Sequence, residues 1–92
     1  MPNFLILNEK DNVAVALEPA KAGDAVTLSG GRTIKANQDI PFAHKIAIQP
    51  LKAGEKVLKY GEVIGAAKEN IKEGDHVHVH NIRSLRGETG KK

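Results

Sequence analysis

The apolar residues of this chain occur in short runs separated by glycine-centred turns, and no run keeps a helical period over three turns. One turn pattern, Lys-x-Gly-acid-x-Val, occurs three times: KAGDAV at 21–26, KAGEKV at 52–57 and KEGDHV at 72–77. A glycine turn that leads into an apolar position typically begins a strand. The pattern therefore predicts an all-β domain built from many short strands.

Seven apolar runs, rich in β-branched residues, are the expected strands. They span residues 4–7, 13–17, 26–28, 45–48, 57–58, 63–67 and 77–82. Gly30-Gly31 predicts a hairpin turn, and the residues before Pro41 are expected to be extended. One or two short helical turns are expected near 51–55 or 68–71. The spacings of the repeated turns, 31 and 20 residues, are too unequal for a solenoid, so a single compact domain is predicted.

The composition limits the classes of function that are open to the chain. Cysteine is absent, which excludes a disulfide framework and a thiolate nucleophile or ligand. The net charge of +3 lies in the last ten residues, because residues 1–82 hold ten basic and ten acidic side chains. Stacking aromatics and a clustered basic face are both missing, so we expect no nucleic-acid partner.

The domain organisation follows from the same observations. No apolar run is long enough to span a bilayer and no signal-like segment is present, so we expect a cytoplasmic protein with no membrane partner. Residues 1–85 are expected to form the domain. Residues 86–92 are expected to form a flexible, basic C-terminal tail.

The stretch EGDHVHVHNI, residues 73–82, holds three of the four histidines at alternate positions. On a strand, His76, His78 and His80 would share one face. Adjacent members, about 6.6 Å apart, could converge on one metal ion, whereas the outer pair, about 13 Å apart, could not. The alternative is a polar outer face whose histidines bind nothing.

Other candidate positions have ordinary structural explanations. His44, in IPFAHKIAI, follows a proline bend at the start of an apolar strand, where a histidine is either a capping hydrogen bonder or a site residue. Gly61 and Gly65, in KYGEVIG, are expected to be turn and packing residues, since no phosphate-binding glycine motif is present. Asp11 and Asn12 are interpreted as turn formers that bond to nearby backbone.

Four motifs in order, DNVAVAL, HKIAI, KYGEVIGAA and GDHVHVHN, resemble the small amino-terminal SAF domain of the altronate/galactarate dehydratase family, which also includes the sulfolactate sulfo-lyases. The resemblance covers about residues 3–85 and implies an SAF-type β-clip fold. It also implies a lyase that eliminates water from a sugar acid, or sulfite in the sulfo-lyases, with a divalent metal such as Fe²⁺ or Mn²⁺. In some members the SAF domain is fused to a larger catalytic region, and in others the two are separate chains. The resemblance therefore implies a small subunit whose partner is a large catalytic subunit, with the metal held jointly.

The resemblance also implies roles for individual residues. The expected catalytic residues are His44, Lys45 and His80, the metal ligands are His78 and His80, and the residues that bind the sugar acid are Lys59, Tyr60 and Asn81. His76, nearest the turn, is expected to matter less. Asn81 is also a candidate for backbone capping or for the interface. The family usually has glycine where this chain has Ala43, and alanine disfavours positive φ, so we expect the loop that presents His44 to be shaped differently.

Three functions fit these motifs. The first is the small subunit of a two-chain hydro-lyase, inactive alone, whose active site lies at the contact with the large subunit. The second is the small subunit of a sulfolactate sulfo-lyase. The third is a non-catalytic SAF module that binds a sugar acid or stabilises a larger enzyme, since fold alone does not fix function. Self-association of the isolated chain is compatible with all three.

Overall fold

The computed structural model describes residues 1–83, and within them it contains nine strands and no helix. The strands are β1 (Asn3–Leu5), β2 (Val13–Ala16), β3 (Ala25–Leu28), β4 (Thr33–Lys35), β5 (Lys45–Ala47), β6 (Lys56–Lys59), β7 (Glu62–Ala67), β8 (His76–Val77) and β9 (Ile82–Arg83). The prediction of an all-β fold is confirmed. The expected basic tail, 86–92, lies outside the described residues.

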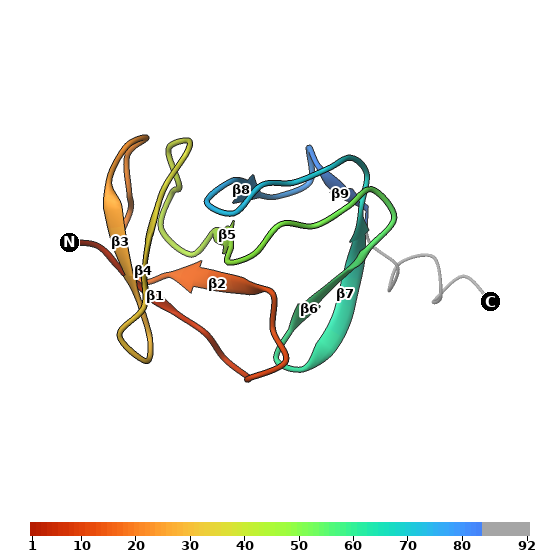
Figure 1. Ribbon diagram of the computed structural model, residues 1–92, viewed down its shortest axis with the longest axis horizontal. Coiled ribbons are helices and arrows are strands. Elements are labelled where there is room, and N and C mark those ends of the chain that lie inside the picture. The colour runs from red at the N-terminus through yellow and green to blue at the C-terminus, as the bar shows by residue number, and fades with distance from the viewer. Residues whose placement is uncertain (84–92) are drawn as a thin grey trace.

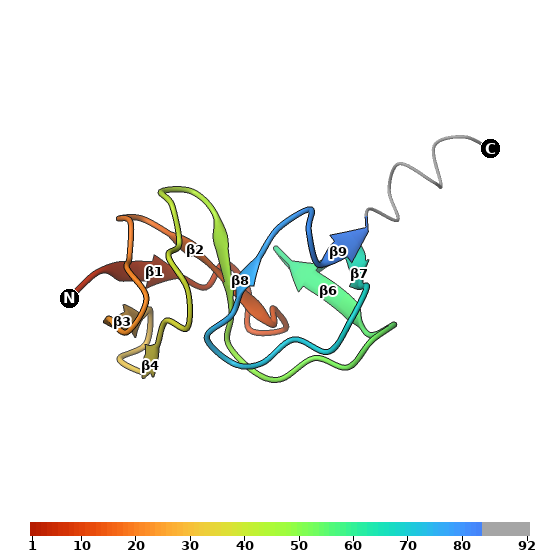
Figure 2. The same ribbon diagram turned by 90° about the horizontal axis from the view of Figure 1, so that it is seen from above.

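Two sheets make up the fold. The six-stranded sheet has the order β4-β3-β1-β2-β5-β8, and the three-stranded sheet has the order β6-β7-β9. Strand β1 pairs with β3 in parallel, and the other pairs are antiparallel. Strands β1, β3 and β4 lie at one end of the molecule, β6, β7 and β9 lie at the other, and β2, β5 and β8 lie between them (Figures 1 and 2). Among the described residues, no helix could span a membrane.

The predicted strands match the observed ones closely, with two exceptions. The first six runs each overlap one of the observed strands, and Gly30 and Gly31 form the predicted turn of the β3–β4 hairpin, both with positive φ. Strand β4 was not predicted, because its three residues hold a single apolar side chain, Ile34. The prediction of a single strand over 77–82 is wrong, because a turn separates β8 from β9 within this run.

The helical turns expected near 51–55 and 68–71 are also wrong for the described part of the chain. Leu51 and Ile71 pair with each other in an antiparallel bridge, with N–H to C=O distances of 2.8 and 2.7 Å. Residues 52–55 form a tight turn, in which the N–H of Glu55 donates to the C=O of Lys52 at 2.8 Å. The N–H groups of Leu51, Gly54, Lys68 and Ile71 donate to distant segments, so they are not free for the i to i−4 bonds of a helix.

Four tight turns, at 21–24, 41–44, 52–55 and 72–75, share one hydrogen-bond pattern. In each turn the N–H of the fourth residue donates to the C=O of the first at 2.8–3.1 Å. The third residue and the fourth residue then exchange two backbone bonds of 2.7–2.9 Å with a buried alanine. The turns at 21–24, 41–44, 52–55 and 72–75 pair with Ala36, Ala16, Ala67 and Ala47, respectively. Each of these alanines is at most 3% exposed. The sequence pattern revealed only three of these turns, because the turn at 41–44 has Ala43 in place of glycine.

The chain is an internal duplication with an offset of 31 residues. The turns at 21–24 and 41–44 recur at 52–55 and 72–75, and the β3–β4 hairpin recurs as β6–β7. The bridge between Ala20 and Ile40 recurs between Leu51 and Ile71. The halves join where β5 pairs with β8, two strands that follow the equivalent turns 41–44 and 72–75. Residues of these two turns therefore meet at the junction of the halves.

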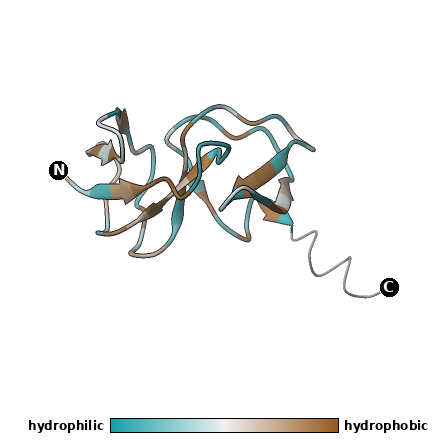
Figure 3. Cartoon of the chain, turned by 90° about the horizontal axis from the view of Figure 1, so that it is seen from below, coloured by the Kyte–Doolittle hydropathy of each residue, from teal (hydrophilic) through white to brown (hydrophobic). Residues whose placement is uncertain are grey.

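The apolar core follows the two halves. One cluster of buried residues surrounds Phe4 and Ile46, and the other surrounds Val57 and Ile71. Apolar residues concentrate on the strands, and many of the connecting segments are hydrophilic (Figure 3). Each fully buried Val, Leu or Ile contributes about 1.5–3 kcal/mol, so these clusters are the main stabilising term.

Buried polar residues join the halves, and the interpretation of Asp11 and Asn12 as local turn formers is incomplete. The amide of Asn12 accepts the N–H of Leu58 at 2.8 Å and donates to the C=O of Lys56 at 2.9 Å. The Asp11 carboxylate accepts the N–H groups of the β6–β7 turn, residues 60 and 61, at 2.9 and 2.7 Å. These bonds span 44 to 50 positions in sequence. Asp11 and Asn12 therefore attach the β6–β7 hairpin to the amino-terminal half.

Substitution of two equivalent turn glycines is expected to separate backbone strain from crowding. Gly54 and Gly74 both have positive φ, which costs an alanine about 1–2 kcal/mol. A Cβ at Gly54 would meet nothing within 4 Å, whereas a Cβ at Gly74 would lie 2.2 Å from the carbonyl oxygen of Lys35. We expect Gly54→Ala to lower the free energy of unfolding by about 1–2 kcal/mol, and Gly74→Ala to lower it by considerably more, measured by urea unfolding. Equal losses at the two glycines would contradict the close approach at Gly74.

The reverse substitution at the fourth turn should stabilise the chain. Ala43 has φ of 70°, so Ala43→Gly relieves the same backbone strain and should raise the free energy of unfolding.

Candidate functional site

The histidine stretch is a short strand followed by a turn, and Asn81 fixes that turn. The Asn81 side chain accepts the N–H of His78 at 2.9 Å and donates to the C=O of His76 at 2.8 Å. Its own N–H donates to the C=O of His78 at 3.0 Å, and the residue is 3% exposed. The buried amide satisfies backbone groups that a strand partner would otherwise bond. The predicted alternation of three histidines along one strand face is therefore wrong, and the expected capping role of Asn81 is confirmed.

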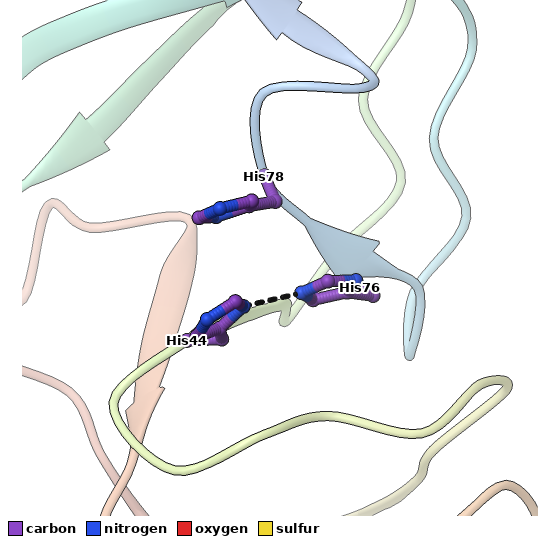
Figure 4. A group of neighbouring side chains, drawn as sticks. All are labelled: His44, His76 and His78. Carbon is purple, nitrogen blue, oxygen red and sulfur yellow. Dashed lines mark hydrogen bonds between the residues drawn. The ribbon is translucent and has the colours of Figure 1, made fainter.

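Three half-buried histidines, His44, His76 and His78, converge at the junction of the two halves (Figure 4). His44 precedes β5, and the pairing of Ile46 with His76 brings β8 alongside it. The Nδ1 atom of His44 lies 2.9 Å from Nε2 of His76. The ring of His78 stacks on that of His44 with centroids 4.2 Å apart. Each histidine offers one ring nitrogen, and the three nitrogens lie within 4.8 Å of one another.

His80 lies beside this group. Its ring centroid is 5.2 Å from that of His76, the two rings are tilted by 36°, and the residue is exposed. The structure thus groups His76 with His44 and His78, where the sequence predicted His80. The strand ends at Val77 and Asn81 closes a turn after it, so the regular alternation that would pair His78 with His80 does not continue to His80. The sequence contained one signal of this arrangement, an asparagine in a position where it can form a turn.

Lys45 lies near the histidine group, and Lys59 lies near Lys45. Lys45 is half-buried, and this burial lowers its pKa, as does the charge of Lys59 to a smaller extent. The charge of Lys45 in turn contributes to lowering the pKa values of His76 and His78. The charge of Lys45, with that of Lys59 near it, makes this face attractive to an anion such as a carboxylate.

The remaining predicted site residues differ in their position. Tyr60 is 68% exposed, with φ at 63°, and Asp11 holds its backbone N–H at 2.9 Å. The side chain of Asn81 is buried and already hydrogen bonded on both sides of its amide. Contacts of Tyr60 and Asn81 with a substrate stay predictions, and for Asn81 such a contact would require one of these bonds to break.

The lowered pKa values of His76 and His78 favour ligand binding at neutral pH. Burial, followed by the positive charges of His44 and the other neighbours, lowers the pKa of His76 to about 4. Burial and the charge of His44 also lower the pKa of His78. Neutral imidazoles carry a free lone pair, which can bind a metal ion or accept a proton. The ring nitrogens of His44, His76 and His78, on three partly exposed residues, fit a divalent metal that keeps positions for other ligands.

The low pKa of His76 makes the stability of the chain depend on pH. An unfolded histidine titrates near pH 6.5, so between pH 4 and 6.5 the unfolded chain binds more protons than the folded chain. We therefore expect the free energy of unfolding of the metal-free chain to be highest above pH 6.5 and to fall as the pH drops to 4. Urea titrations across this range should show a smaller slope for His76→Gln, with only the His78 contribution remaining. An unchanged slope in His76→Gln would contradict this assignment.

Comparison with known proteins identifies the family of this chain. The sequence model of the altronate/galactarate dehydratase SAF domain matches residues 2–85. Altronate dehydratase from Bacillus subtilis is 37% identical over 84 residues, which are 91% of this chain and 17% of that protein. Altronate dehydratase from Escherichia coli is 38% identical over 81 residues, 88% of this chain and 16% of that protein. The (2R)-sulfolactate sulfo-lyase subunit alpha from Chromohalobacter salexigens is 36% identical over 90 residues, 91% of this chain and 96% of that subunit.

The chain thus spans about a sixth of the length of the altronate dehydratases and nearly all of the sulfo-lyase subunit alpha. The match over residues 2–85 covers most of the sequence. This protein belongs to the family of altronate/galactarate dehydratase SAF domains.

Proposed function

We propose that this protein is the small subunit of a two-chain lyase that eliminates water from a sugar acid, with an active site completed by a large catalytic subunit. The observation that carries the proposal is the group of His44, His76 and His78 next to Lys45. A 92-residue β domain offers little concave volume for a six-carbon acid, so a second surface is needed to enclose the substrate.

Elimination next to a carboxylate requires three things. A base removes the α-proton, an acid protonates the leaving group, and positive charge stabilises the developing enolate. We assign binding of the substrate carboxylate to Lys45 and Lys59, because Lys45 lies near the histidines and Lys59 lies near Lys45. Tyr60 follows Lys59 on an exposed turn, and we assign it a contact with the substrate. His80, exposed beside His76, is left for proton transfer.

A divalent metal fits the histidine group. His44, His76 and His78 would hold it, and when bound it would act as a Lewis acid on a substrate oxygen. This assignment moves His44 from proton transfer to ligation and gives His76 the place that the sequence suggested for His80. Imidazole donors suit iron better than manganese, which prefers oxygen ligands, so Fe²⁺ is the better match of the two. The large subunit would supply further ligands.

Exposed apolar residues next to the cluster support a shared active site. Phe42, 65% exposed, lies two positions before His44, and Val79, 71% exposed, follows His78 directly. These side chains are available to a protein that covers this surface, and their burial would contribute to its binding. A partner seated on Phe42 and Val79 would exclude water from the histidines. This partner is the large catalytic subunit in our proposal.

Elimination of sulfite from sulfolactate is the second candidate function. The observation that favours it is the length of the match. This chain aligns with 96% of a sulfolactate sulfo-lyase subunit alpha but with only 17% of an altronate dehydratase. The same lysines would bind the carboxylate, and sulfite would leave in place of water. The third possibility is a non-catalytic SAF module. Such a module would need no metal, and changing its histidines would not lower the turnover of the complex.

Reconstitution with the cognate large subunit tests the proposal. We expect the purified chain alone to show no measurable turnover, and the complex to be active on a sugar acid such as altronate or, for the second candidate, on sulfolactate. In the complex, His76→Ala and His44→Ala should each lower turnover by about a hundredfold or more. Lys45→Ala should raise KM, because it removes a charge that binds the carboxylate. Lys21→Ala, an exposed lysine in another turn, is the matched control and should leave both constants unchanged.

Three results would contradict the proposal. Turnover by the isolated chain would exclude a shared active site. Full activity of both histidine variants in an assembled complex, with folding checked by circular dichroism, would support the non-catalytic module. The absence of any divalent transition metal from complexes purified without oxygen, despite full activity, would exclude the metal.

A further inference from the structure

The four tight turns differ in what the side chain of their fourth residue does. In three of them an acid caps the N–H of the first residue: Asp24 that of Lys21, Glu55 that of Lys52 and Asp75 that of Lys72, each at 2.9 Å. These carboxylates are thereby held by their own turns. The fourth turn has His44 in the position of the acid, and its first residue is Pro41, which has no N–H.

Loss of this N–H leaves the turn itself intact. The N–H of His44 still donates to the C=O of Pro41 at 3.1 Å, and Ala43 and His44 still exchange two bonds with Ala16, at 2.9 and 2.8 Å. Only the capping interaction is missing. The side chain of His44 instead lies against β8, where its Nδ1 is 2.9 Å from Nε2 of His76. Since turns 41–44 and 72–75 are equivalent, the molecule contains a capped copy and an uncapped copy of one turn.

The atom that contacts His76 is also the atom that would cap the turn. Nδ1 of histidine is bonded to Cγ, as is the carboxylate oxygen of aspartate, so both lie three bonds from Cα. A histidine at position 44 could therefore accept an N–H from residue 41 through Nδ1, much as Asp75 accepts one from Lys72. The N–H of residue 41 and the ring of His76 would then compete for a single nitrogen.

We propose that Pro41 is a positioning residue of the histidine cluster: by removing the N–H that the side chain at position 44 would cap, it directs Nδ1 of His44 to His76. As a role in metal binding, the proposal rests on the proposed function. As a statement about the orientation of His44, it stands on the hydrogen bonds of the four turns alone.

The first test compares Pro41→Ala with the wild-type full chain, with Co²⁺ as a spectroscopic probe for the metal site. Pro41→Ala restores one N–H and should weaken Co²⁺ binding about three- to tenfold, the factor that one hydrogen bond is worth. Long-range ¹H–¹⁵N NMR of the imidazoles, without metal, should show Nδ1 of His44 leaving His76. Pro50→Ala is the matched control, because Pro50 is exposed and the residue three positions later, Ala53, has no group that could cap. It should change Co²⁺ affinity less than twofold.

The outcomes separate this inference from the proposed function. Wild-type Co²⁺ affinity in Pro41→Ala, with the His44 ring still at His76, would overturn the role of Pro41. If the wild-type chain bound no Co²⁺, the metal assignment would fail, while the NMR comparison would still decide what Pro41 does.

A second test uses thermal stability and does not depend on metal. Pro41→Ala is made in two backgrounds, His44→Asp, whose carboxylate can cap the new N–H, and His44→Ala, which cannot cap it. We expect Pro41→Ala to be more favourable in the aspartate background, with a difference in Tm of about 4 °C or more, the shift typical of one such interaction in a small domain. Equal effects of Pro41→Ala in both backgrounds would show that position 44 does not cap position 41, and would overturn the proposal.

Discussion

The structure depends on one repeated unit, a tight turn joined by two backbone hydrogen bonds to a buried alanine. It occurs four times, with Ala16, Ala36, Ala47 and Ala67 at most 3% exposed. A methyl group is small enough for the turn to approach closely, and the two bonds leave no buried backbone group unpaired at the contact. Because the units recur 31 residues apart, they generate two similar halves. The pairing of β5 with β8 at the junction then brings His44 to His76.

Features with a local physical cause could be predicted from the sequence. The glycine turns and the β3–β4 hairpin were predictable, because glycine is the residue that adopts positive φ without strain. Features that depend on distant partners were not. Asp11 and Asn12 have the composition of a local turn, yet their partners lie 44 to 50 positions away. The alternation of histidines indicated a strand, but Asn81 bonds the backbone of His76 and His78 and ends it.

The same distinction applies to the candidate site. His44 and Lys45 were identified from their motif, and the structure places both at the junction of the halves. The place of His76 could not be predicted, because it follows from strand pairing and not from spacing. Ala43 was expected to change the shape of its loop, yet it takes φ of 70° and the turn keeps the geometry of its glycine counterparts. Two bonds to Ala16 hold the turn against a strain of about 1–2 kcal/mol.

The two halves place different chemistry at equivalent positions. At 72–75, Asp75 caps Lys72 and also accepts a bond of 2.8 Å from Asn37, so its carboxylate is fully used in stabilising the fold. At 41–44, the equivalent side chain makes no bond to its own turn and faces β8. The missing cap costs about 1 kcal/mol, which is small beside the 5–15 kcal/mol that typically stabilises a domain. A duplicated frame can therefore keep three turns as structural elements and use the fourth to present a histidine, because the backbone bonds to alanine hold all four turns in the same way.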